Sequence, residues 1–289
     1  MARFSSWIAL LAAGALLSTA ASAEPVSGTL GPYAVAMEQD ASLPDHTIYR
    51  PADLNAVRGK LPMIAFGNGG CANVGSAYKT FLGEVASHGY VVTAPGPIEP
   101  PAPVAGQRPS QSKPQQMQAA LTWAQAQAAK PGGVYQGRID TDRLAVMGQS
   151  CGGVQTFAVA GDPRITTLMI WNSGVGMIPN NPADPAKALA SIHTPVAFIY
   201  GDAQNDIAHR ASAMNVPALT TVPVFGAWQD GMTHLGTYGQ KDGGFYGKIA
   251  VAWLDWRLKG DQRAARMFKG ADCTLCTAPS WHVTKSKID

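Results

Sequence analysis

The feature that most constrains the fold of this chain is an alternation of short apolar runs with segments of helical spacing. Short apolar strands separated by helices are typical of a parallel sheet that is covered on both faces. The sequence therefore predicts the α/β class, with a mostly parallel central sheet and helices on both faces. The strand-like runs lie at residues 33–39, 46–50, 61–66, 90–94, 144–147, 168–171, 196–200 and 221–225. The expected helices lie at residues 76–88, 115–129, 153–160 and 245–258.

Composition removes several classes of protein. The 289 residues are 46% hydrophobic and 14% charged, whereas charged residues usually make up about 25% of a soluble domain. A disordered chain, a coiled coil and a highly charged nucleic-acid binder are therefore excluded. The formal net charge of +3 is too small and too dispersed to indicate an acidic partner. With no internal repeat and no long linker, we expect one domain, and we expect a monomer without a nucleic-acid partner.

The first 23 residues are typical of a secretory signal peptide. Arg3 supplies a positive start, residues 7–17 form an apolar run, and Ala21-Ser22-Ala23 resembles a cleavage site of small residues. The alternative is an uncleaved membrane anchor, but the run is shorter than the ~20 residues that a span needs. No other stretch is long and apolar enough to cross a membrane. We therefore expect a mature chain of residues 24–289, secreted or periplasmic, whose cysteines can form disulfides.

One motif places a serine between a strand and a helix. Residues 148–152 read Gly-Gln-Ser-Cys-Gly, directly after the strand at 144–147 and directly before the helix at 153–160. In that context the G-x-S-x-G pattern predicts a sharp turn that strains the serine backbone and projects the hydroxyl above the sheet. The alternative is an ordinary glycine turn with a solvated serine. The context favours Ser150 as a nucleophile.

A nucleophilic serine needs a base and an acid that orients the base, and in this architecture they follow in the order Ser, acid, His. Only His209, His234 and His282 lie late enough in the chain. His209 is expected one turn into a helix, and His282 in the tail after the last helix. His234 lies in a loop that follows a strand, where an exposed base is expected. We therefore predict His234 as the base, the alternative being a surface-loop histidine.

The acid should lie just past the strand at 196–200. Asp202 follows that strand directly and is also suited to binding loop amides. Asp206 lies four residues later, where the loop turns back over the sheet. Asp230 is a third candidate, although a carboxylate in that loop is more typical of a solvated side chain. We predict Asp206 as the acid.

An oxyanion hole needs two backbone N–H donors near the developing charge. Cys151, the residue after the nucleophile, should supply one, and the glycine-rich loop at 67–71 should supply the other. Read as a phosphate cradle, that loop lacks both the Lys-Ser/Thr of a P-loop and the G-x-G-x-x-G spacing. The pattern favours acyl transfer to water through Ser150, which requires no metal and no organic cofactor.

With these motifs the chain looks like an α/β-hydrolase, and more narrowly it resembles the secreted bacterial cutinase-like polyester hydrolases and their dienelactone-hydrolase-like relatives. The segment at 86–92 resembles the family's segment before the fourth strand, and the segment at 195–200 with Asn205-Asp206 resembles its acid strand and loop. The resemblance covers most of the mature chain. It implies a single α/β-hydrolase catalytic domain at residues 24–289 with no large lid, and it implies Cys71 as the other oxyanion-hole residue.

The resemblance also indicates substrate contacts. Trp171 resembles the family's aromatic wall beside the acyl site, the alternative being a core tryptophan, and Gly70 and Gln149 are expected to line the same site. The family usually has an aromatic residue or His in place of Gln149, a Met in place of Cys151 and an aromatic residue in place of Cys71. The aromatic clamp for a polymer ring is therefore incomplete, and a polymer substrate does not follow.

Four cysteines allow three disulfide pairings. Cys71 and Cys151 would flank the oxyanion hole from adjacent loops, so we expect a bridge between them that fixes the hole, and a small bridge between Cys273 and Cys276 in the tail. The alternative for the second pair is zinc, with His282 as a third ligand. Because these ligands are too few for a closed zinc site, no metal is expected.

The expected function is that of an exported serine esterase that cleaves short-chain carboxylic esters, with polyesters as further candidates. Two alternatives stay open. The first is a peptidase or thioesterase on the same site, although a peptidase of this fold usually carries a gating domain for which the mature chain has no room. The second is a non-catalytic secreted binding protein of hydrolase fold. An intact Ser-Asp-His set argues against that second alternative.

Overall fold

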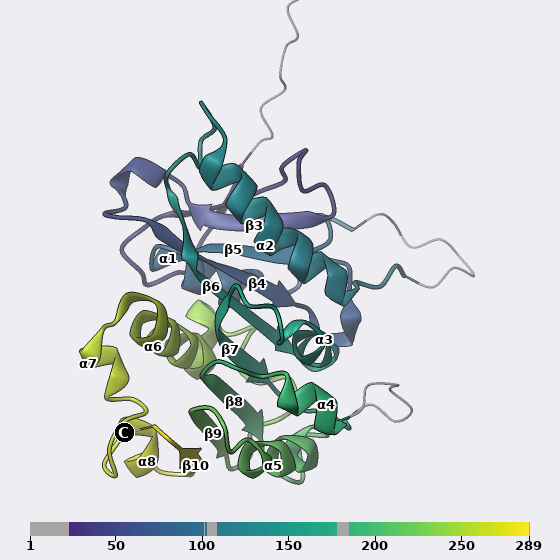
Figure 1. Ribbon diagram of the computed structural model, residues 1–289, viewed down its shortest axis with the longest axis vertical. Coiled ribbons are helices and arrows are strands. Elements are labelled where there is room, and N and C mark those ends of the chain that lie inside the picture. Colours follow the sequence, from purple (N-terminus) through teal and green to yellow (C-terminus); the bar gives the residue numbers. More distant parts are fainter. Residues whose placement is uncertain (1–22, 101, 103–108, 178–184, 289) are drawn as a thin grey trace, which may run out of the picture.

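A ten-stranded sheet forms the centre of the computed structural model, which describes residues 23–100, 102, 109–177 and 185–288 (Figure 1). The strand order is β1-β2-β3-β5-β4-β6-β7-β8-β9-β10. The block from β5 to β9 is parallel, and β3 and β10 pair antiparallel with its two ends. The predicted α/β class with a mostly parallel sheet is therefore confirmed. The strands are β1 Glu24–Val26, β2 Val35–Glu38, β3 His46–Pro51, β4 Leu61–Gly67, β5 Val91–Pro95, β6 Ile139–Gln149, β7 Ile165–Trp171, β8 Val196–Gly201, β9 Val224–Gln229 and β10 Trp281–Ser286.

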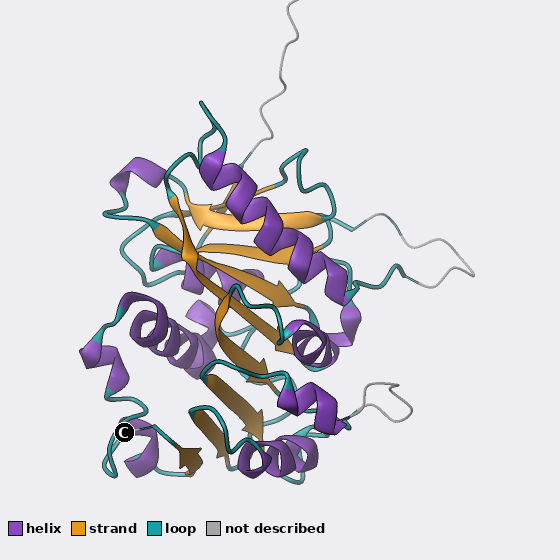
Figure 2. Cartoon of the chain, in the orientation of Figure 1, coloured by secondary structure: helices purple, strands orange, loops and turns teal. Residues whose placement is uncertain are grey.

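Helices cover both faces of this sheet (Figure 2). The two longest of them, α2 and α6, lie on opposite faces. None of the helices within the described ranges is both long and apolar enough to cross a bilayer. The helices are α1 Lys79–Ser87, α2 Pro114–Ala129, α3 Cys151–Val159, α4 Pro185–Ala190, α5 His209–Ala218, α6 Gly244–Lys259, α7 Gln262–Ala265 and α8 Thr274–Thr277.

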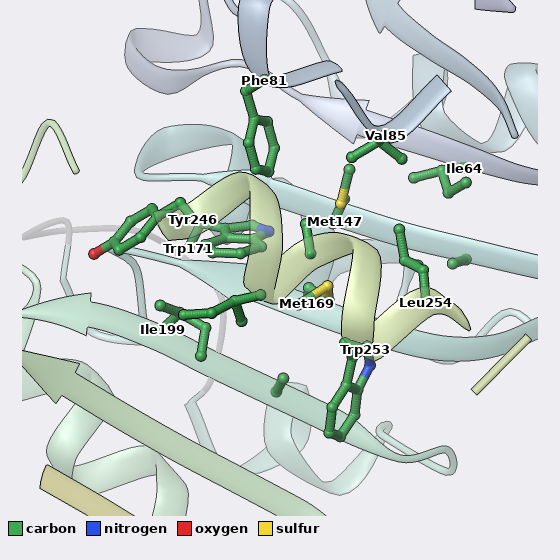
Figure 3. Packing of buried hydrophobic residues seen from close by; sticks show 14 of the residues in the cluster. Ile64, Phe81, Val85, Met147, Met169, Trp171, Ile199, Tyr246, Trp253 and Leu254 are labelled. Atoms are coloured by element: carbon green, nitrogen blue, oxygen red, sulfur yellow. The ribbon is translucent and has the colours of Figure 1, made fainter. Parts of the chain in front are cut away.

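Successive residues of the central strands enter two different cores, as the period of two in a strand requires. In β7, Met169 and Trp171 face the core under α1 and α6, whereas Leu168 and Ile170 face the core under α2, α3 and α5. Figure 3 shows the first of these cores, where side chains of α6 and α1 pack onto the sheet. This burial on both faces explains why the central strands are apolar without alternation.

Some elements differ from the sequence-based expectation. The strand expected at 221–225 begins instead at Val224 and ends at Gln229, because Pro223 has no N–H to donate to a ladder. β10 was not predicted, since its exposed and buried residues alternate in the manner of an edge strand rather than a buried one. It places His282 on a strand beside β9 instead of in an irregular tail. Residues 1–22 of the expected signal peptide lie outside the described residues.

The carboxyl ends of β4, β6, β8 and β9 lead into the loops that carry the predicted site residues. Because these strands are parallel, all four loops emerge at the same edge of the sheet. At that edge, the backbone of α3 lies against the loop after β4. A Cβ atom on Gly152 would stand 2.0 Å from the carbonyl oxygen of Gly67, and a Cβ atom on Gly148 would stand 2.3 Å from the carbonyl oxygen of Gly152. Glycine is therefore required at both positions.

Replacing Gly152 with alanine should destabilise the protein by about 1–3 kcal/mol, because backbone atoms at 2.0 Å cannot move aside as a side chain can. Gly161→Ala is the matched control, since a Cβ there meets its nearest atom at 3.5 Å. Urea unfolding of both variants beside the wild type measures the difference. Equal unfolding free energies for the two variants would contradict the close contact.

Candidate active site

Ser150 lies at the tip of a tight turn between β6 and α3. Its backbone has φ +53° and ψ −119°, a conformation that residues with a side chain rarely adopt. Its N–H donates to the carbonyl of Trp171 at 2.9 Å, and the hydroxyl of Ser173 donates to its carbonyl at 2.7 Å. These bonds hold the strained backbone, so that the structure has the sharp turn that the G-x-S-x-G pattern predicts.

The structure brings Ser150, His234 and Asp206 together in one hydrogen-bonded line. The Nε2 atom of His234 lies 2.8 Å from Oγ of Ser150, and its Nδ1 atom lies 2.6 Å from Oδ1 of Asp206. The three residues come from three loops, at the ends of β6, β8 and β9. The His234 side chain is 20% exposed and that of Asp206 is fully buried. This geometry fits a nucleophile, a base and an acid that orients the base.

Four hydrogen bonds satisfy the buried Asp206 carboxylate. Besides His234, the donors are the amides of Gly201 at 2.7 Å and Ala208 at 2.9 Å, and the side-chain amide of Asn172 at 2.8 Å. Burial by itself raises the pKa of Asp206, but these hydrogen bonds outweigh burial and hold that pKa below its usual value of 3.8. The carboxylate is therefore ionised at neutral pH, which favours the Nδ1–H form of His234.

Asn172 is a site residue that the sequence analysis missed. It follows β7 with φ +40°, and its side chain donates to Asp206 while its Oδ1 accepts from Tyr238 at 2.7 Å. It therefore holds the Asp206 carboxylate from the end of β7, a strand that leads to none of the three predicted residues. A position directly after a central strand was the available signal, but it does not distinguish Asn172 from the other polar residues of such loops.

The remaining acid and base candidates have other partners. Asp202 accepts from the backbone amides of the loops at 204–205 and 231, so the alternative interpretation of a loop-binding carboxylate describes it. His209 begins α5 and contacts the Gly201 carbonyl at 2.8 Å through Nδ1. His282 pairs with Asp230 at 2.9 Å. Asp202 thus connects the loop after β8 to the loop after β9.

A disulfide joins the two loops that were expected to form the oxyanion hole. Cys71 and Cys151 are bonded, with Cα atoms 5.2 Å apart. Cys71 has φ +50°, its carbonyl accepts from the Ser112 amide at 2.8 Å, and its sulfur accepts from the Gln155 side chain at 3.0 Å. The loop after β4 is thereby attached to the N-terminus of α3, where backbone N–H groups and the helix dipole favour negative charge.

The second expected disulfide, between Cys273 and Cys276, is also formed. The zinc alternative needs both sulfurs as thiolates, and the bridge removes them. The third ligand of that alternative, His282, stacks on Trp228 with ring centroids 3.8 Å apart. The Cys273–Cys276 bridge therefore connects the two ends of a short C-terminal turn.

The expected substrate contacts are corrected in two of three cases. Gly70 is exposed on the loop after β4, and its contact with a substrate stays a prediction. Trp171 is 0% exposed, and its ring packs against Phe81, Tyr238 and Tyr246 in the core of Figure 3. The alternative interpretation of a core tryptophan therefore describes it. Gln149 is 2% exposed, so its side chain points into the fold and not toward the surface where a substrate would bind.

Asp206→Asn should reduce the free energy of unfolding at neutral pH, and the difference from the wild type should narrow in acid. A carboxyl group whose pKa is lower in the folded state stabilises the fold above its unfolded pKa, and that contribution is lost as the pH falls through the folded pKa. The difference should therefore be constant near pH 7 and shrink below pH 3.8. Urea unfolding across this range measures it. A difference that stays constant in acid would contradict the lowered pKa.

The two disulfides should differ in their contribution to stability and activity. The Cys71–Cys151 bridge spans 80 positions and the Cys273–Cys276 bridge spans 3. Loop-closure entropy therefore gives about 4.5 kcal/mol for the first bridge and about 2 kcal/mol for the second. Paired Cys→Ser variants of each bridge, compared by urea unfolding, measure this. The variant without the Cys71–Cys151 bridge should also lose catalytic turnover, whereas the variant without the Cys273–Cys276 bridge should keep it. Equal losses of turnover in both would contradict a special role for the first bridge.

A family model described as PET hydrolase-like matches residues 18–284, which include the serine turn, the acid loop and the base loop. A search of curated proteins found no match. Because the family match spans most of the chain and the fold is that of an α/β-hydrolase, the chain belongs to the PET hydrolase-like family.

Proposed function

We propose that this protein is an exported serine esterase that hydrolyses carboxylic esters through an acyl-enzyme, with Ser150 as nucleophile, His234 as base and Asp206 as the orienting acid. The observation that carries the proposal is the unbroken line from Ser150 Oγ to His234 at 2.8 Å and on to Asp206 at 2.6 Å. Membership of the PET hydrolase-like family supports ester hydrolysis of the serine type independently of this geometry.

In the first half-reaction, His234 takes the proton of Ser150 while Oγ attacks the ester carbonyl carbon. Asp206 stabilises the imidazolium that forms, and the backbone N–H groups of Cys71 and Cys151 donate to the oxyanion. His234 then protonates the leaving alcohol. In the second half-reaction, His234 takes a proton from water, which attacks the acyl-enzyme carbonyl. The bond to Ser150 Oγ then breaks, His234 returns the proton to Oγ, and the carboxylic acid leaves.

The side chains around the hydrogen-bonded line of Ser150, His234 and Asp206 favour an accessible substrate site. Ile207 and Leu235 follow the acid and the base directly, and each side chain is 76% exposed. Exposed apolar side chains that directly follow Asp206 and His234 in the chain suit an apolar acyl or aryl group held at the surface. We infer that the substrates are small esters and exposed segments of a polyester, rather than a fatty acid held in a tunnel.

Export is the second part of the proposal. The N-terminal segment with its small-residue cleavage site supports export. Two disulfides support it as well, because such bonds persist in oxidising compartments. We propose a mature monomer that begins at Glu24.

The test is hydrolysis of p-nitrophenyl esters, from acetate to dodecanoate, by the mature protein and by its Ser150→Ala variant. We expect turnover of the short esters and a loss of at least about 1,000-fold in kcat on removal of the hydroxyl. Release of soluble acids from a polyester film then tests the polymer substrate. Equal turnover by both proteins, or no turnover by a folded wild type, would overturn the proposal.

A further inference from the structure

The residue before the nucleophile, Gln149, uses its side chain to connect two loops of the site. Its Nε2 donates to the carbonyl oxygen of His234 at 3.0 Å, and its Oε1 accepts from the hydroxyl of Tyr78 at 2.7 Å. The same hydroxyl accepts from the backbone N–H of Gly69 at 3.2 Å. The bonds thus run from the oxyanion loop after β4, over the serine turn, to the base loop after β9.

The direction of every bond in this chain is determined by its two ends. The His234 carbonyl can only accept, so the amide nitrogen of Gln149 must face it and the amide oxygen must face Tyr78. The N–H of Gly69 can only donate, so the Tyr78 hydroxyl accepts there and gives its own proton to Gln149. Burial raises the pKa of Tyr78 to about 12, which keeps that proton in place.

Packing leaves these side chains little freedom. A Cβ atom on Gly69 would stand 1.9 Å from Oε1 of Gln149 and 2.4 Å from the hydroxyl of Tyr78, so both groups lie directly on the glycine. The ring of Tyr78 packs edge-on against Phe66 and Tyr238, with centroids 5.0 and 5.2 Å apart. With 2% of Gln149 exposed, these neighbours cover its amide group and keep it from the surface where a substrate would bind.

Resting on the proposed function, we propose that Gln149 and Tyr78 are positioning residues that hold the His234 main chain in register with the oxyanion loop. The base and the oxyanion donors must keep one geometry while the base gives and takes protons in two half-reactions. A misplacement of about 1 Å in such a site can cost about 100-fold in rate. Gln149 thus acts through His234 and Gly69, and it makes no substrate contact.

The first experiment measures kcat and KM on p-nitrophenyl acetate for Gln149→Met, Gln149→Glu and Tyr78→Phe. Gln149→Glu keeps the acceptor for Tyr78 and removes the donor to His234. We expect kcat to fall by about 10–100-fold in the Gln149 variants, with KM within about two-fold of the wild type. A raised KM with unchanged kcat would overturn the proposal in favour of a substrate contact.

Matched controls separate positioning from general stability. Gln127 and Tyr135 are buried on the α2 side of the sheet, where their side chains bond to Ser42 and Glu38. Gln127→Met and Tyr135→Phe should lower the unfolding temperature but keep kcat. If the Gln149 variants lose no more kcat than these controls, the proposal is wrong.

The double variant of Gln149 and Tyr78 should show a smaller loss of kcat than the product of the two single losses, because the two side chains share one hydrogen bond.

A second readout requires no turnover and therefore survives failure of the esterase proposal. The proton between His234 Nδ1 and Asp206 gives a downfield NMR resonance that reports the geometry of this 2.6 Å bond. We expect the resonance to shift or broaden in Gln149→Met and Tyr78→Phe and to stay in place in the two controls. An unchanged resonance in Gln149→Met would overturn the proposal.

Discussion

Gly152 approaches Gly67 so closely that a methyl group on it would stand 2.0 Å from a carbonyl oxygen. This backbone contact decides where the N-terminus of α3 lies relative to the loop after β4. The Cys71–Cys151 bond then joins the two segments covalently, with Cα atoms 5.2 Å apart. Backbone segments from two distant parts of the chain can lie this close because no side chain separates them there.

A second constraint is the buried charge of Asp206. An ionised carboxylate below the surface is costly unless its oxygens are satisfied, and here two backbone amides, an asparagine and a histidine satisfy them. The same bonds that lower its pKa hold His234 in line with Ser150. The stability of the loop that carries Asp206 and the alignment of His234 therefore depend on one set of hydrogen bonds.

The fold class and the three residues of the line could be predicted because each leaves a local signal. The apolar strands and the serine turn at Gly148–Gly152 are patterns of neighbouring residues. The acid and the base were predicted from their place just after a strand and from the chain order Ser, acid, His. The family resemblance placed Trp171 and Gln149 at the substrate site, whereas both side chains are buried. A resemblance at these positions does not say which side chains reach the surface. β10 was missed because an edge strand with alternating exposure lacks the apolar run that marks a central one.

The sequence by itself determined the α/β order, the sharp turn that carries Ser150 and the cysteines available for pairing, because backbone preference and hydrophobic period act over a few residues. Only the tertiary structure decided which polar groups meet. Asn172 on Asp206, and Gln149 between Tyr78 and His234, are contacts across 34, 71 and 85 positions of the chain. Such contacts depend on how strands stack side by side, and no local pattern encodes a distance between loops.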